Sequence, residues 1–449
     1  LMDERFNADL KEELQAALDH AQDLINDRSE DEETNKAAAT AINSLLSAVN
    51  ASIKSYNNLQ TFFDDTLLPA TDKYEGKAVY EELFNRLSEM ADEVNPVLDE
   101  CTWTDEQIAD FIASFDTIVK EEIQKAWDKA VESGEALEED LDISPLFEQL
   151  AYTYSTSAVS NTNVPDKEWQ YGDATNFKTQ YGTAEVWNQS PFKVSRTLAD
   201  LPAGKYTVTT KAFFRNADNE TNLAEYDELN TPETYLFAGS VKTGLTNVAA
   251  LASEDLAELP GAADVNGIFV PNTQQGAYQL FNDEAYTDLL EKSVSTVLVS
   301  EGDLTFGVGA DQMQSNSWVV WYTFSIVYNA PDHNALLDVL AALDEQAISL
   351  QEDEDVVLVH AADDNINDAQ SDYQSVASMS DDELAALITK YEDAIAYAEE
   401  SKTLVQKIKE EYERYTSYLM SGIESDEPNF NELIGNIERD ANSAKKYWH

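Results

Sequence analysis

The sequence predicts an α+β multidomain protein in which a central antiparallel β-sandwich is flanked by two α-helical bundles. The spacing of apolar residues is helical at both ends of the chain and alternates in the middle. Turn-forming, β-branched and aromatic residues also become frequent in the middle. We therefore expect a helical bundle at 1–144, a β-sandwich at 145–330 and a second helical bundle at 331–449. The length of 449 residues fits roughly three domains.

The N-terminal third has apolar residues at every third or fourth position. One clear seam consists of Ile42, Leu46, Val49, Ile53 and Tyr56. We expect helices over residues 1–30, from 42 to Pro69, from 77 to 94, and from Thr104 onward. We expect the third helix to stop before Pro96, because proline disrupts a helix interior. Thr104 and Gln107 have the spacing of a capping box, which predicts the start of the fourth helix.

The middle third alternates between apolar and polar residues, most clearly in Tyr206–Arg215. Pro202 and Gly204 supply the turn before this strand. The predicted strands are Ala184–Asn188, Phe192–Leu198, Tyr206–Arg215, Thr234–Ala238, Val294–Ser300, Leu304–Gly309 and Ser317–Tyr328. We expect a loop at Asn216–Glu233 and a short helix near Asp283–Glu291. Many short strands joined by turns predict an antiparallel sandwich or jelly roll.

Helical spacing returns after residue 331, and Ser380 with Glu383 forms a second capping-box pattern. A final helix is expected to end near Lys446. The segment Thr104–Phe115 aligns without gaps to Ser380–Tyr391, with matching cap, acidic first turn and apolar positions. Duplication and independent use of the same helix-start pattern both explain this similarity.

The composition excludes several classes of partner. There are 28 basic and 87 acidic residues, and the formal net charge is −59. Such a chain lacks the basic surface that nucleic acids and anionic membranes require, so we expect neither as a partner. No apolar run is long enough to span a membrane. The single cysteine, Cys101, rules out an intrachain disulfide and is expected to be a small buried apolar residue.

The sequence contains no recognised catalytic or cofactor-binding motif. Asp363, Asn365 and Asn367 match the start of a calcium loop, but Asp368 stands in place of the required glycine. The four histidines are scattered without zinc-ligand spacing. We therefore expect a non-enzymatic protein with no metal site and no cofactor, weakly bound Ca²⁺ being the one ion that the acidity would favour.

Residues 180–330 resemble the galactose-binding-like β-sandwich modules of surface and secreted proteins from Bacteroidetes-type bacteria. The matching segments are Phe192–Leu198, Leu201–Tyr206, Ala212–Arg215, Leu304–Val308 and Trp318–Phe324. Many such modules carry Asp-Asn before the last phenylalanine, where this chain has Tyr322 and Thr323. The resemblance implies a jelly-roll fold, an extracellular or cell-surface location and carbohydrate binding, with the helical arms as spacers.

The candidate glycan site consists of Trp321, Phe213 and Arg215, which alternation places on the non-core face of their strands. A tryptophan offers a flat apolar surface to a sugar ring, and an arginine offers paired donors. The competing interpretation is that both sheet faces are covered and that Trp321 belongs to the core. The aromatic stretch ending at Trp187 is a second candidate, with packing onto the sandwich edge as its alternative.

The preferred hypothesis is a non-catalytic cell-surface protein whose sandwich binds a neutral glycan, because the negative charge would repel anionic glycans. The alternative is a structural subunit of a surface layer, filament or adhesin, in which the sandwich only packs, other surface proteins are the partners and the chain self-assembles. A glycoside hydrolase is the third hypothesis and has the least support, since neither a catalytic signature nor a barrel-sized domain is present.

Overall fold

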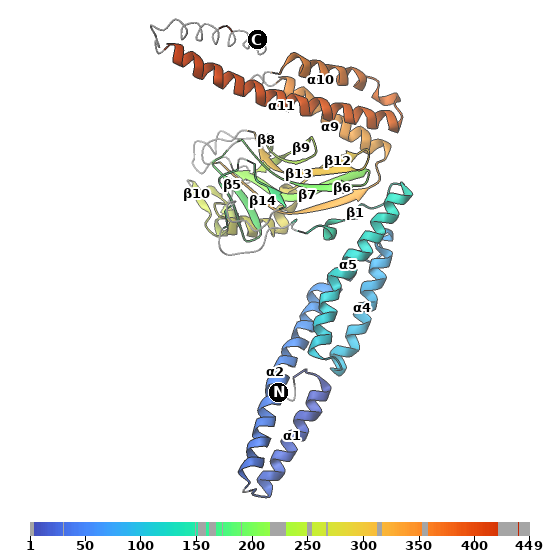
Figure 1. Ribbon diagram of the computed structural model, residues 1–449, viewed down its shortest axis with the longest axis vertical. Helices are drawn as coiled ribbons and strands as arrows, with labels where there is room; N and C mark the ends of the chain where they lie inside the picture. Colours follow the sequence, from blue (N-terminus) through green and yellow to red (C-terminus); the bar gives the residue numbers. More distant parts are fainter. Residues whose placement is uncertain are drawn as a thin grey trace, which may run out of the picture. The chain divides into compact units, whose positions relative to one another are not determined.

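The computed structural model describes most of the chain. The described residues are 4–29, 31–148, 150, 159–160, 168–172, 174–189, 191–215, 230–248, 254–265, 268–311, 317–352, 358–420 and 439. The chain divides into two compact units. The first consists of Leu1–Glu132 and Leu137–Leu146, and the second of Ser133–Ala136 and Phe147–His449. The second unit therefore holds almost all of the strands and the C-terminal helices (Figure 1).

The first unit is built almost entirely from helices. They are α1 (Ala8–Asn26), α2 (Glu32–Phe62), the π-helix η1 (Phe63–Leu67), α3 (Leu68–Tyr74), the 3₁₀-helix η2 (Ala78–Tyr80), α4 (Glu81–Glu100) and α5 (Asp105–Ser133), followed by β1 (Leu141–Asp142) and the 3₁₀-helix η3 (Ser144–Leu146). The capping box at the start of α5 is present: the Thr104 backbone N–H donates to Gln107 Oε1 at 2.9 Å, and the Gln107 N–H to Thr104 Oγ1 at 3.3 Å.

Two proline predictions for this unit are wrong. Pro96 lies inside α4 instead of beyond its end. The buried apolar face on either side, with Val94, Val97 and Leu98, outweighs the local cost of the proline. Pro69 does not end the helix either, because α2 runs on through the π-helix η1 into α3 and Pro69 lies just after this π-helical segment, where the regular hydrogen-bond ladder is interrupted.

The second unit contains a large curled sheet. Its strands are β2 (Val159–Ser160), β3 (Trp169–Gln170), β4 (Phe177–Gln180), β5 (Thr183–Trp187), β6 (Phe192–Leu201), β7 (Gly204–Arg215), β8 (Asn230–Ala238), β9 (Val241–Asn247), β12 (Glu291–Leu298), β13 (Gly302–Ala310) and β14 (Trp318–Asn329). Hydrogen bonding joins them in the order β2-β4-β5-β14-β7-β9-β8-β13-β6-β3, with β12 also paired to β7. All of these pairs are antiparallel except β7 with β9.

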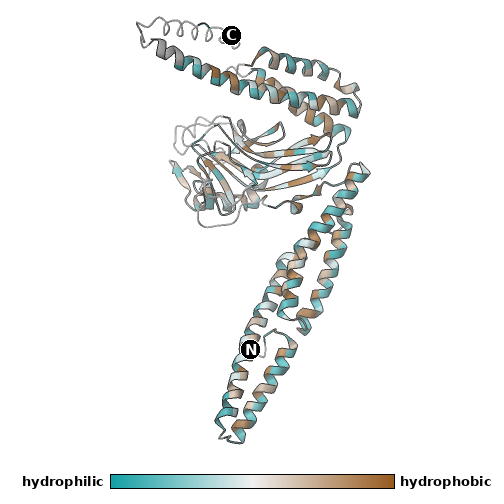
Figure 2. Ribbon diagram, in the orientation of Figure 1, coloured by the Kyte–Doolittle hydropathy of each residue, from teal (hydrophilic) through white to brown (hydrophobic). Residues whose placement is uncertain are grey.

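The sheet curls until distant strands share one interior. Trp169 of β3, at the far end of the order, lies 5.1 Å from Phe324 of β14 and 5.8 Å from Phe306 of β13, measured between ring centroids. All three side chains are buried. Figure 2 shows hydrophobic residues along these strands. The core of the unit is therefore the inner side of the curl, and the outer side is free to carry other elements.

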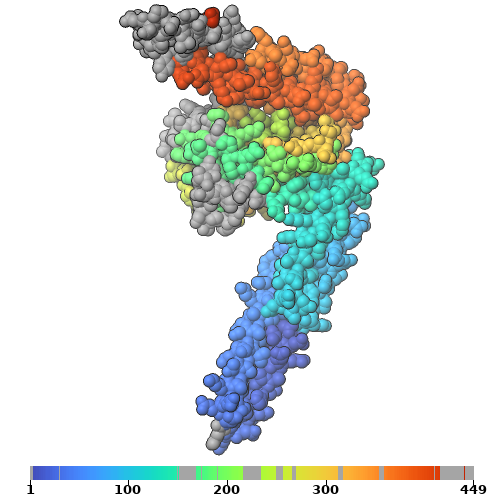
Figure 3. Space-filling model, viewed as in Figure 1, coloured from blue at the N-terminus to red at the C-terminus, as the bar shows by residue number. Residues whose placement is uncertain are grey.

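Two further layers complete the unit. A segment after β9 contributes the short hairpin β10 (Ala263–Val265) and β11 (Ile268–Val270), and then α7 (Gln274–Phe281) and α8 (Thr287–Leu290). The C-terminal helices are α9 (His333–Glu352), α10 (His360–Tyr373) and α11 (Asp381–Met420), and α9 packs against β9 and β12. In the space-filling view these helices, orange to red, lie against the yellow and green strands (Figure 3).

Most strand predictions hold to within a few residues, and α8 confirms the short helix near 283–291. The capping box at Ser380 is also present, with the Ser380 N–H donating to Glu383 Oε2 at 2.8 Å. The predicted loop 216–233 is wrong at its end, because β8 begins at Asn230, and residues 216–229 lie outside the described part. The final predicted helix, ending near Lys446, lies outside it as well.

Candidate functional site

The structure separates the three residues of the first candidate site. Trp321 is fully buried and pairs with Ala212 in the sheet, whereas Phe213 pairs with Val320 and Arg215 with Trp318. The register shifts between Trp321 and Phe324, and this bulge reverses the parity of the strand. The prediction that Trp321 shares a face with Phe213 and Arg215 is therefore wrong, and Trp321 lies on the inner side beside Phe177.

Phe213 lies on the outer side of the sheet, but it is fully buried. Helix α7 and its neighbours cover it. The cluster around it consists of Val248, Leu256, Ala277, Leu280, Phe281, Leu290, Trp318 and Val320. The Phe213 ring lies 5.4 Å from Phe281 of α7 and 5.5 Å from Trp318. Phe213 therefore anchors the α7 layer and offers no surface to a ligand.

The outer side becomes a cleft just beyond this cover. A cleft of about 300 Å³ is lined by Asn176, Lys178, Glu185, Trp187, Arg215, Asn272 and Trp318. We call it the Trp187 cleft. Four neighbouring strands, β4, β5, β14 and β7, supply five of these residues. Trp187 is directly opposite Trp318, which is directly opposite Arg215, so these three side chains form one row across the strands.

Trp187 is the exposed aromatic residue of the row. Its side chain is 45% exposed, whereas Trp318 is 3% and Arg215 1% exposed. The residue closes β5, where the strand leaves the sheet toward Asn188 in the left-handed region at φ 49°. An indole that remains half open beside a buried indole gives the cleft a flat apolar wall. Trp187, which belongs to the predicted second candidate, is thus the exposed one of the two tryptophans that line the cleft.

The floor of the cleft holds one anionic and one cationic side chain, each contacted by neutral groups. Trp318 Nε1 donates to Glu185 Oε2 at 2.7 Å, and the Arg215 guanidinium lies 5.3 Å from the centre of the Trp318 ring. Arg215 also donates to the Pro271 carbonyl at 2.8 Å and to Asn272 Oδ1 at 2.5 Å. Burial raises the pKa of the Glu185 carboxyl, while Trp318, Lys178 and Arg215 act in the opposite direction. Both charges are therefore held in fixed orientations.

Loop residues at the cleft are positioned by side-chain hydrogen bonds. Gln189 Oε1 accepts from the backbone N–H groups of Thr175 and Asn176, at 2.8 and 3.0 Å. This contact ties the approach to β4 to the exit from β5. On the opposite rim, Asn272 immediately precedes Thr273, whose hydroxyl caps α7 by accepting from the Gly276 N–H at 3.0 Å. The amides of Asn176 and Asn272 are exposed and stand at the two rims.

Of the residues that line the Trp187 cleft, sequence reasoning named Trp187 and Arg215 as site candidates. It did not name the other five, which are Asn176, Lys178, Glu185, Asn272 and Trp318. Glu185 carries a signal that could have identified it, since it lies two residues before Trp187 on the same strand and so on the same face. Lys178 is directly opposite Glu185 in the register of β4 and β5, a pairing that no local pattern reveals. Asn272 lies in a loop that is distant in the sequence, and the packing of the following helix, α7, brings it to the cleft.

The predicted partial calcium motif is part of a helix. Asp363, Asn365 and Asn367 lie inside α10, where Asp363 Oδ1 accepts from Gln351 Nε2 at 2.6 Å. Within the described ranges, no cluster of three or more histidine, cysteine or carboxylate side chains is arranged to hold a metal ion. The same ranges contain no helix that is both long and apolar enough to cross a membrane.

Comparisons with known proteins give weak likenesses. No protein-family model matches the chain, and no curated protein matches it. Among solved structures, TmCBM61 in complex with β-1,4-galactotriose is 12% identical, with a TM-score of 0.18, over 36% of this chain and 88% of that one. The CBM51-2 and INT domains of Clostridium perfringens ZmpB are 6% identical, with a TM-score of 0.16, over 57% of this chain and 46% of theirs.

A third similar structure is BtGH115A, a 4-O-methyl-α-glucuronidase of family GH115 with specificity for decorated arabinogalactans. It is 8% identical, with a TM-score of 0.20, over 74% of this chain and 34% of that one. The present chain thus spans about a third of that protein. TM-scores at this level do not establish a shared fold.

Proposed function

We propose that this protein binds a neutral glycan in the Trp187 cleft and has no catalytic activity of its own. The observation that carries the proposal is the half-exposed indole of Trp187 in a cleft whose other lining residues, apart from Trp318, are polar. Sugar rings present C–H patches that stack on aromatic faces and hydroxyls that need donors and acceptors. Trp187 supplies the first contact, and the Asn176, Asn272 and Lys178 side chains supply the second.

The contacts that already hold the charged side chains of the cleft favour a neutral ligand. Arg215 is engaged by Asn272, Pro271 and the Trp318 ring, and Glu185 by the Trp318 indole. Lys178 is directly opposite Glu185 in the sheet. A charged sugar would have to compete with these contacts inside a molecule with a formal charge of −59. A neutral sugar can accept and donate hydrogen bonds without displacing any of them.

A hydrolytic role has less support in this cleft. Glycoside hydrolysis generally needs two carboxyl groups on opposite sides of the bond that is cleaved. Among the described residues that line the Trp187 cleft, Glu185 is the single one with a carboxyl group. We further propose that the curled sheet is a galactose-binding-like sandwich of a secreted or cell-surface protein, with the helices at 1–144 and 331–449 serving as spacers.

The test is affinity electrophoresis of the protein through gels that contain soluble neutral polysaccharides, namely galactan, xylan, mannan and β-glucan. We expect at least one to retard the wild type and Trp187→Ala to abolish the retardation. Tyr397→Ala is the matched control, because Tyr397 is an aromatic residue of α11 with a similar exposure of 41% outside the cleft. Migration of the wild type unchanged in all four gels, or equal retardation of Trp187→Ala, would overturn the proposal.

A further inference from the structure

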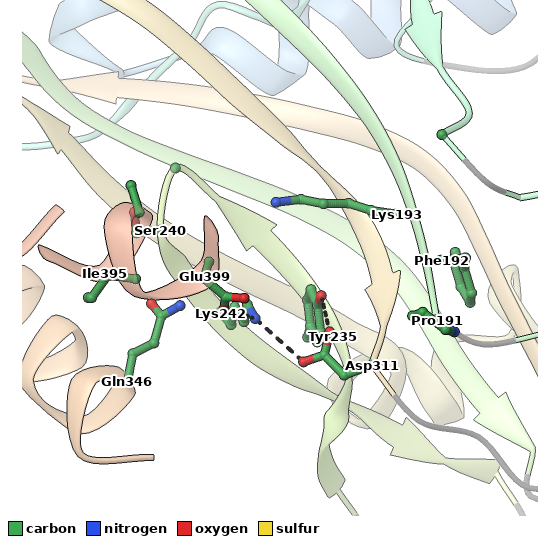
Figure 4. Close-up of a pocket in the computed structure, with 13 residues that line it drawn as sticks. Pro191, Phe192, Lys193, Tyr235, Ser240, Lys242, Asp311, Gln346, Ile395 and Glu399 are labelled. Atoms are coloured by element: carbon green, nitrogen blue, oxygen red, sulfur yellow. Dashed lines mark hydrogen bonds and ion pairs between the residues drawn. The ribbon is translucent and has the colours of Figure 1, made fainter. Parts of the chain in front are cut away.

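A second pocket lies between the sheet and the C-terminal helices, within the same unit. It has a volume of about 450 Å³, and its walls come from β6, β8, β9, the end of β13, α9 and α11. This size is within the usual range for small-molecule sites. Figure 4 shows Lys193, Lys242, Tyr235, Asp311, Gln346 and Glu399 around it. We call it the Lys193 pocket, and none of its residues lines the Trp187 cleft.

The two lysines of the pocket differ in their partners. Lys242 Nζ lies 3.5 Å from Asp311 Oδ2 and 3.6 Å from Glu399 Oε1, so it bridges both carboxylates. Lys193 Nζ stands 4.2 Å from the centre of the Phe237 ring. Among the residues that the structure describes, Lys193 Nζ makes neither a hydrogen bond nor an ion pair within 4.0 Å. One ammonium in this pocket is thus paired and the other is open to an anion.

The charge balance makes the open ammonium unusual. The chain has three acidic residues for every basic one, since 87 acidic residues face 28 basic ones. Part of the Lys193 side chain is exposed, yet desolvation around its ammonium and the nearby Lys242 lower its pKa, with Glu399 and Asp311 opposing them. An anion beside Lys193 would relieve both effects. Because both carboxylates of the pocket already contact Lys242, the ammonium of Lys193 is the group that indicates an anion-binding site.

The pocket also offers acceptors to a ligand. Gln346 Oε1 is buried and has no hydrogen-bond partner within the described part of the chain, and its side chain extends from α9 into the pocket (Figure 4). Asp311 Oδ1 accepts from the Tyr235 hydroxyl at 2.8 Å, and each carboxylate retains further lone pairs. These acceptors would repel a bare anion and would bind hydroxyl groups. The favoured ligand therefore combines a carboxylate with several hydroxyls.

We propose that the Lys193 pocket binds a uronic acid or the uronate residue of an acidic glycan. The carboxylate would pair with Lys193, and the hydroxyls would donate to Asp311, Glu399 and Gln346. A neutral sugar leaves Lys193 without its anion, and a simple carboxylate such as acetate leaves the acceptors without donors. Because the pocket joins strands to α9 and α11, occupancy also links the helices to the sheet. This proposal is independent of ligand binding in the Trp187 cleft.

The test is isothermal titration of the full chain with galacturonate and with glucuronate, with galactose and acetate as comparison ligands. We expect a uronate to bind and to raise the melting temperature, and both comparison ligands to bind at least about tenfold more weakly. Lys193→Gln should weaken uronate binding about tenfold or more. Lys54→Gln removes the same charge from an exposed site on α2 and should leave the affinity unchanged.

Two further variants separate this site from the first. Trp187→Ala should leave uronate affinity unchanged, whereas Gln346→Leu should lower it without altering retardation by neutral polysaccharides. The proposal is overturned if neither uronate binds the wild type, if Lys193→Gln binds as well as Lys54→Gln, or if acetate binds as tightly as a uronate. Loss of uronate binding in Trp187→Ala would also overturn it, because the ligand would then occupy the Trp187 cleft.

Discussion

Two neighbouring rows of side chains on the outer side of one sheet differ in their exposure to solvent. The row that contains Val320 and Phe213 is buried under α7. In the next row Trp318 and Arg215 are also buried, and only Trp187, at the end of the row, reaches the surface. Both rows cross β5, β14 and β7. Their difference teaches that the end of a covering helix, rather than the composition of the strands, decides where the sheet has a cleft.

The strongest test of this contrast is the covered row. Phe213→Ala should lower the free energy of unfolding by about 3–5 kcal/mol, because it leaves a cavity among Phe281, Trp318 and Val320. Urea denaturation followed by circular dichroism measures the change. Phe213→Leu serves as the control and should cost clearly less. A loss below roughly 1 kcal/mol for the alanine variant would mean that α7 does not bury this row.

A second test concerns Glu392, a residue outside the cleft whose titration would mask the smaller pH effect expected from Glu185 in the cleft. Burial, with a smaller contribution from Asp393, raises the pKa of Glu392 on α11 to about 7, from 4.5. Because the raised pKa means that the fold favours the protonated form, Glu392 contributes most below pH 4.5, and this stability is lost as the pH rises to about 7. Glu392→Gln should therefore be more stable than the wild type by roughly 2–3 kcal/mol at pH 8, and nearly equal to it at pH 4.

The comparison of the two proteins is made by urea denaturation at both pH values. Using the difference between variant and wild type cancels the contribution of the other acidic residues. A difference that stays constant from pH 4 to pH 8 would show that Glu392 titrates normally.

Within the Glu392→Gln background, Glu185→Gln reports on the cleft itself. Burial raises the pKa of Glu185, so its ionisation also lowers stability as the pH rises above the value of the unfolded chain. We expect the glutamine variant to gain stability relative to its parent between pH 4 and pH 7. The gain should be smaller than that of Glu392→Gln, because Trp318, Lys178 and Arg215 oppose the effect of burial. If Glu185→Gln instead loses stability relative to its parent over this range, the pKa of Glu185 is not raised.

The smallest expected effect on stability is that of replacing Trp187, the exposed residue of the second row. Trp187→Ala should change the free energy of unfolding by no more than about 0.5–1 kcal/mol, because the side chain is 45% exposed. The same urea experiment measures it beside Phe213→Ala. A cost similar to that of Phe213→Ala would place Trp187 in the core and remove the contrast between the rows.

The sequence predicts the local features of this fold well. Alternation identifies β5, β6, β7, β12, β13 and β14, and hydroxyl-to-amide or carboxyl spacing identifies the starts of α5 and α11. These features depend on residues that are close together in the chain. Burial is less accessible: Leu387 and Tyr391 of α11 are buried, whereas the aligned Phe111 and Phe115 of α5 are only partly so. The same helical pattern has different partners in the two units.

The candidate site could be predicted only in part, because it depends on contacts between segments that are distant in the sequence. The bulge after Trp321 comes from long-range pairing between β14 and β7, so simple alternation assigned Trp321 to the wrong face. Helix α7 covers Phe213 but leaves Trp187 exposed. The segment that forms α7 has no regular spacing of apolar residues, so its sequence did not predict this helix. Trp187 and Arg215 were found because their chemistry is conspicuous. Their actual neighbours, Glu185 and Asn272, required the three-dimensional structure.

The hydrogen bonds that Gln189 makes to the backbone of Thr175 and Asn176 bear on how fast a ligand would be captured. They fix one rim of the Trp187 cleft before any sugar arrives, so ordering that rim takes nothing from the affinity. Association should then be a single kinetic phase, proportional to ligand concentration, with no slow rearrangement. Differences in affinity among glycans would lie almost wholly in how long each remains bound.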